Sequence, residues 1–122
     1  MKTEWWQRGP VDAVPAMLQP VAHIVLQIGE SVPQLVDGLN EAEWNARPGG
    51  IASCAFHVRH IIGVLDRLFT YARGEALSAM QFVSLRGEGQ PITLSYAPEL
   101  LMQLEVQVAI SMAQLRDRKS VV

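Results

Sequence analysis

The fold is decided by residues 51–73, IASCAFHVRHIIGVLDRLFTYAR, which read as one amphipathic helix. Apolar residues recur there at steps of three and four, the spacing that gathers side chains on one side of a helix. The apolar stripe is His57, Ile61, Val64, Leu65, Leu68, Tyr71 and Ala72, and the polar cluster opposite is Arg59, Asp66, Arg67 and Thr70. We therefore expect a helix from Ile51 to Arg73, closed by Gly74 as a left-handed cap, with His57 and His60 on or beside its buried face.

A second helical pattern precedes this stretch, from about Val11 to Leu39. Pro20 and Pro33 lie inside the pattern, where proline removes a backbone donor, so we expect one long helix with kinks. An end at Asp37-Gly38 is equally compatible with the sequence. Trp5 and Trp6, ahead of this helix, are expected to pack the N-terminus onto the protein rather than to line a pocket.

A third helix is expected from Ala97 to about Arg118, because Pro98 suits a first helical turn. Its apolar face is Leu101, Leu104, Val108, Met112 and Leu115. Residues 75–94 are less regular and predict a short helix lying across the others, built on Met80, Phe82, Val83 and Leu85, followed by a loop over 87–91. No alternating strand pattern of useful length is present. Three helices with one apolar side each must bury those sides on one another, which predicts an all-α bundle.

Composition places residues 1–122 in one domain of ordinary size. Hydrophobic residues make up 49% and charged residues 18%, and no apolar run is long enough to cross a membrane. The N-terminus lacks the apolar region of a secretory signal, so we expect a cytoplasmic protein. A net charge of −2 argues against nucleic acid or an anionic membrane as a partner, and the short basic run 116–119 reads as a solvated helix end.

The candidate chemistry lies in His57 and His60, which are three residues apart and therefore neighbours on a helix. Their ring nitrogens suit a divalent metal ion, but a catalytic metal site usually has three protein ligands. The alternative is that one histidine is held by a hydrogen bond in the structure while the other faces solvent. Cys54 lies six residues before His60, turned about 120° away from it on a straight helix, and reads better as a small buried thiol. His23 falls on the polar side of the first helix.

Residues 44–68, WNARPGGIASCAFHVRHIIGVLDRL, resemble the second-helix region of DinB-like proteins, and WWQRGP at 5–10 resembles one branch of that superfamily. The resemblance implies an up-down four-helix bundle in which three histidines hold a divalent metal, zinc or nickel. One of them precedes an aliphatic residue on the second helix, as His60 precedes Ile61. The other two form a His-x-x-x-His on the last helix, and this sequence has neither that pair nor a fourth helix after Leu115.

In characterised relatives the metal activates a bound water or a low-molecular-weight thiol; they include thiol S-transferases, mycothiol-dependent isomerases and hydrolases. With His60 and His57 alone, the resemblance implies a metal bound weakly or not at all and a C-terminally incomplete site. Whether the chain is an enzyme therefore stays open. The other hypothesis is a non-catalytic bundle that covers its exposed apolar face with a second copy, as a dimer, or with another partner.

Overall fold

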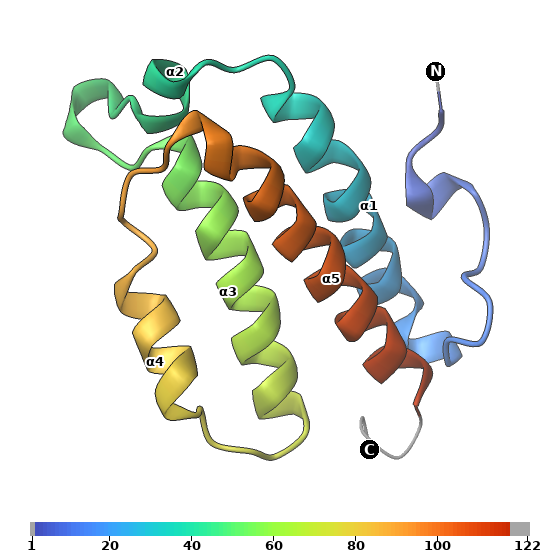
Figure 1. The fold of residues 1–122 in the computed structure, drawn as a ribbon. Helices are drawn as coiled ribbons and strands as arrows, with labels where there is room; N and C mark the ends of the chain where they lie inside the picture. Colours follow the sequence, from blue (N-terminus) through green and yellow to red (C-terminus); the bar gives the residue numbers. More distant parts are fainter. Residues whose placement is uncertain (1, 118–122) are drawn as a thin grey trace.

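Five helices carry the fold in the computed structural model, which describes residues 2–117. They are α1 (Gln19–Val36), α2 (Glu41–Asn45), α3 (Cys54–Ala72), α4 (Ala79–Arg86) and α5 (Ala97–Arg116), with 3₁₀ turns η1 (Trp5–Gln7), η2 (Ala16–Leu18), η3 (Pro48–Gly50) and η4 (Leu94–Tyr96). Between residues 2 and 117 there is no strand. α1 runs opposite to α3 and α5, and α4, on the side of α3 away from α5, carries the chain back before α5 begins (Figure 1). The expected all-α bundle with three long helices is confirmed.

The core lies where α5 packs between α3 and α1 (Figure 1). One cluster of buried side chains, centred on Trp44, Leu100 and Leu104, joins the ends of the helices nearest α2. A second cluster, centred on Val25, Phe69 and Met112, joins their opposite ends. The predicted inner face of α5 is correct, since its five residues are all buried or half-buried.

The start of α1 differs from the prediction. Residues 11–15 are irregular, although Val11 and Val14 are buried, and the Gln19 side chain ties this segment down by bonding the backbone of both. Pro20 then falls in the first turn of α1, where no partner for its missing N–H is required, so the kink predicted there is wrong. Pro33 does lie inside the helix, which ends at Val36.

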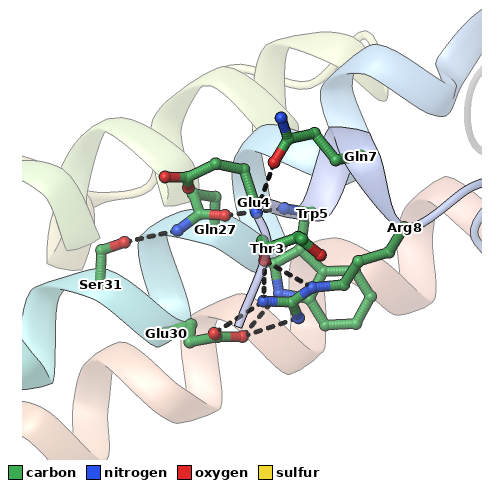
Figure 2. Close-up of polar contacts among 8 residues, drawn as sticks. All are labelled: Thr3, Glu4, Trp5, Gln7, Arg8, Gln27, Glu30 and Ser31. Atoms are coloured by element: carbon green, nitrogen blue, oxygen red, sulfur yellow. Dashed lines mark hydrogen bonds and ion pairs between the residues drawn. The ribbon is translucent and has the colours of Figure 1, made fainter. Parts of the chain in front are cut away.

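The N-terminal segment is fastened to α1 by the contacts drawn in Figure 2. The backbone N–H of Trp5 donates to Gln27 Oε1 at 2.9 Å, and its indole Nε1 donates to Glu30 Oε2 at 2.9 Å. The Arg8 guanidinium forms a two-pronged ion pair with Glu30 and lies over the Trp5 ring. The hydrogen bond from Arg8 lowers the pKa of the Glu30 carboxyl. Trp5 therefore packs the N-terminus as expected, whereas Trp6 is exposed.

α2 is a small anchor in the stretch between α1 and α3. Asn40 caps its N-terminus and Glu43 bonds back to the Asn40 backbone, a capping box. This turn inserts Trp44 into the core with 2% of its surface exposed. Asn45 donates to the Ile92 carbonyl and accepts from the Ile92 N–H, which fixes the segment before η4.

α3 begins one turn later than predicted and buries a different face. Ser53 caps its N-terminus, so Ile51 stays outside the helix and exposed. The buried residues are Ala55, Val58, Leu65, Phe69 and Thr70. Of the predicted stripe, His57, Leu68, Tyr71 and Ala72 are exposed. The helix carries two apolar arcs, and the core uses the one with Val58, Leu65 and Phe69. Of the predicted stripe, Leu65 is therefore buried and Ile61 packs against the core, while the rest of the stripe is not buried.

Gly74 takes the predicted left-handed cap, with φ of +77°. No helix in the described part of the chain is long and apolar enough to cross a membrane.

Candidate functional site

α4 lies alongside α3 rather than across the bundle as predicted (Figure 1). None of its residues is buried, and the four apolar side chains that predicted it are all exposed: Met80, Phe82, Val83 and Leu85. Polar contacts hold it instead, because Gln81 Nε2 donates to Asp66 Oδ2 at 3.0 Å and to Thr70 Oγ1 at 2.8 Å. The amphipathic pattern misplaced this helix because its attachment is polar.

The turn after α4 is pinned to α3 by Arg59. Its Nη1 donates to the carbonyl oxygens of Gly87 at 3.1 Å and Gln90 at 2.7 Å. The guanidinium also lies 5.7 Å from the centre of the Tyr96 ring, an arrangement that favours a cation. The backbone around Glu88 is thereby fixed over the surface of α3.

Glu88 is the buried charge of this region, with 5% of its surface exposed. Its Oε1 accepts from His60 Nδ1 at 2.8 Å, and its Oε2 accepts from Arg67 Nη1 at 2.7 Å. Gly63 allows this approach, because a Cβ there would collide with the carboxylate and lie 2.6 Å from Arg67 Nη1. A buried carboxylate is retained when it is paired and hydrogen-bonded, as this one is.

The contact with Glu88 decides how His60 presents its ring. An ionised carboxylate only accepts hydrogen bonds, so the proton of a neutral His60 ring is on Nδ1 and the lone pair is on Nε2. No hydrogen bond to Nε2 occurs among residues 2–117, and 45% of the side chain is exposed. The free nitrogen can bind a metal ion or accept a proton.

His57 is exposed, so the expectation that it lies on or beside the buried face of α3 is wrong. Phe56 packs against both imidazoles, edge-on to His57 at 5.5 Å and stacked on His60 at 5.2 Å between ring centres. His57 makes no hydrogen bond through its ring within the described residues. A joint role of His57 and His60 as ligands stays a prediction.

The other ligand-type residues are engaged elsewhere. His23 Nε2 contacts the Gly9 carbonyl at 2.9 Å and so belongs to the N-terminal attachment. Cys54, the first residue of α3, is partly buried beside the Trp44 cluster, and burial raises the pKa of its thiol. A raised pKa disfavours the thiolate, the form that binds metals and attacks electrophiles.

The described residues do not fit a complete metal centre, because no three histidine, cysteine, aspartate or glutamate side chains among them are placed to hold one ion. One part of such a centre does fit. Histidines that bind metals usually donate their second ring N–H to a carboxylate, as His60 does to Glu88.

Arg118 and Lys119 of the basic run lie outside the described residues.

Sequence reasoning found His60 and missed Glu88, which it placed in a loop of no assigned role. A glutamate between two glycines in a surface turn gives no sign of burial. The one available signal was Gly63, an isolated glycine inside a strong helical pattern, which often marks a close approach by another group.

Comparison with known proteins identifies the family of the chain but no individual relative. The profile of the DinB superfamily, DinB_2, matches residues 27–120. No curated protein and no solved structure matches the chain. The matched range contains α2 to α5, including His60 and Glu88. The chain therefore belongs to the DinB superfamily.

Proposed function

We propose that this protein is a ligand-contributing member of its superfamily, which presents one oriented imidazole, His60, and does not complete a metal centre by itself. The observation that supports the proposal is the His60–Glu88 hydrogen bond, which leaves Nε2 free on an exposed ring. The metal-dependent thiol transferases and hydrolases of the superfamily need further ligands, and the described residues offer none in reach of one ion.

Each residue around His60 has a distinct part in this arrangement. Glu88 fixes the tautomer and the ring orientation through Nδ1. Arg67 holds the carboxylate in place through Oε2. Phe56, stacked on the ring, restricts its rotation. These residues prepare one ligand, and a reaction would need ligands from another chain or molecule.

Titration of the metal-free protein with Ni²⁺ or Zn²⁺ tests the proposal. We expect weak metal binding that His60→Ala abolishes. His57→Ala should change the affinity by less than about threefold, because a partner that orients the ring usually contributes about tenfold or more in affinity and only His60 has one. Calorimetry gives affinity and stoichiometry.

Tight stoichiometric binding by the isolated monomer would contradict this proposal, since it would require a complete ligand set. Equal losses in His57→Ala and His60→Ala would show instead that the two histidines chelate together. Unchanged binding in His60→Ala would place the metal elsewhere on the protein.

The exposed stripe of α3 supports a second role, completion of the bundle by another copy of the chain. Leu68 and Tyr71 have 58% and 55% of their surfaces exposed, and the half-buried Val64 lies one turn before Leu68 on the same side of the helix. Monomeric proteins rarely expose a continuous apolar strip of this kind. A two-fold axis would place the same stripe of each subunit against the other.

Leu68→Glu is expected to weaken a dimer by about tenfold or more, because it puts a charge in the centre of an apolar contact. Sedimentation equilibrium measures the effect. Met102→Glu is the matched control, since Met102 is equally exposed but lies on the outer side of α5. If the wild-type protein stays monomeric at all concentrations, the α3 stripe does not form a dimer. If Met102→Glu dissociates a dimer and Leu68→Glu does not, the interface lies on α5 instead of α3.

A further inference from the structure

A groove of about 450 Å³ lies between α3, α4 and α5. This volume is in the range of small-molecule sites. Its lining combines Ile62 and Gly63 of α3 with polar side chains from α3, α4 and α5. Glu88 also borders it, but both oxygens of that carboxylate are already bonded to His60 and Arg67.

Two opposite charges in the groove have no ion-pair partner among residues 2–117. Arg59 uses Nη1 for two backbone carbonyls, and no bond within that range occupies its Nε or Nη2. Asp66 accepts from Gln81 through Oδ2, which leaves Oδ1 free. Both side chains are half-buried and held in position by these bonds, so ordering them on binding costs little.

The separation of the two charges sets the length of a ligand that reaches both. Arg59 and Asp66 are seven residues apart on α3, so their Cα atoms are about 10 Å apart at a rise of about 1.5 Å per residue, and we take this as the approximate span of a ligand that contacts both side chains. An extended peptide spans about 3.3–3.6 Å per residue, so three residues cover about 10 Å. A single amino acid is too short.

α5 adds two hydrogen-bond acceptors to the lining of the groove. Gln103 donates to the Tyr96 hydroxyl and Gln107 donates to Ser111 Oγ, so neither side-chain oxygen has a partner in the described structure. The two residues lie one turn apart on α5 and both line the groove. Such oxygens accept from the N–H groups of a peptide backbone.

We propose that the groove binds a linear zwitterion of the length of an extended tripeptide, with its carboxylate at Arg59 and its ammonium group at Asp66. Gln103 and Gln107 accept hydrogen bonds from the N–H groups between the two ends. This site depends on the groove and not on metal binding by His60, so either proposal can fail without the other.

Triglycine, titrated into the full chain by calorimetry, is the probe. We expect saturable binding that is about tenfold weaker for N-acetyltriglycine, which lacks the ammonium group, and for diglycine, which is too short to reach both charges. Asp66→Asn should weaken triglycine binding about tenfold, while the acetylated peptide should bind the variant and the wild type equally. Asp37→Asn, an exposed carboxylate after α1, is the matched control and should change nothing.

Three outcomes overturn the proposal: no saturable binding of triglycine at millimolar concentration, equal affinity for the free and acetylated peptides, or equal affinity of Asp66→Asn and Asp37→Asn. Because Asp66 also holds Gln81, the circular dichroism of Asp66→Asn is compared with wild type. If that variant loses helix, the comparison of triglycine with N-acetyltriglycine and diglycine on the wild-type protein still tests whether the groove binds both ends of the peptide.

Discussion

Trp44→Ala is expected to lower the free energy of unfolding by about 3–5 kcal/mol, which is the usual cost of removing a buried tryptophan side chain. Trp44 is 2% exposed and packs in the cluster with Leu100 and Leu104, where α2 meets α5. Its removal leaves a cavity that the surrounding helices cannot fill without moving. The total free energy of unfolding of a domain is about 5–15 kcal/mol, so this loss is a large share of it. We expect the Trp44→Ala variant to unfold at a clearly lower urea concentration than wild type.

Urea unfolding followed by circular dichroism measures this loss. Trp6→Ala is the matched control, because Trp6 is 54% exposed and its truncation should change stability by less than about 0.5 kcal/mol. Equal effects of the two variants would contradict the placement of Trp44 in the core. The tryptophan fluorescence of the Trp6→Ala protein should still report a buried indole.

The sequence predicted the helices better than the faces they bury. The existence of α1, α3 and α5 follows from their apolar spacing, and the inner face of α5 was identified correctly. On α3, the pattern selected the arc with Leu68 and Tyr71, whereas the structure buries the arc with Val58 and Phe69. Both arcs are apolar, and spacing within one helix does not show which neighbour lies on which side.

The short elements were harder to predict because local bonds and not periodicity form them. Apolar spacing predicts no helix at α2, although Asn40 and Glu43 have the spacing of a capping box, a signal that is present in the sequence. The irregular segment before α1 depends on the Gln19 side chain, whose backbone contacts leave no pattern. Elements of this kind are determined by local hydrogen bonds between side chains and the backbone, which apolar spacing does not report.

For the candidate site, the sequence and the family resemblance indicated His60 but not its environment. The second-helix motif and the His-x-x-His spacing single out the residue. Glu88, 28 residues further along the chain, reaches His60 only because α4 turns back along α3 (Figure 1). No local pattern predicts a contact over that separation.

Glu88→Ala is expected to lower the free energy of unfolding by about 2–3 kcal/mol, the range for removing one member of a buried, charged hydrogen-bond network. The Arg67 guanidinium, whose side chain is 12% exposed, would lose its carboxylate partner, and His60 Nδ1 would lose its acceptor. Of the hydrogen bonds that tie the turn after α4 to α3, those from Arg59 to the backbone would remain. Urea unfolding measures the change.

Glu88→Gln separates the charge from the shape at the same position. The amide can accept from one of the two donors but not balance the Arg67 charge, so its cost should fall between wild type and Glu88→Ala. Nitrogen NMR of the His60 ring, recorded at a pH where the ring is neutral, gives a second reading: wild type should carry the proton on Nδ1, and Glu88→Ala should lose that single tautomer. A loss in Glu88→Ala below about 0.5 kcal/mol together with an unchanged tautomer would mean that the carboxylate does not orient His60. Then the main support for a prepared ligand at His60 would be gone, because an unrestrained imidazole on an exposed helix is an ordinary surface residue.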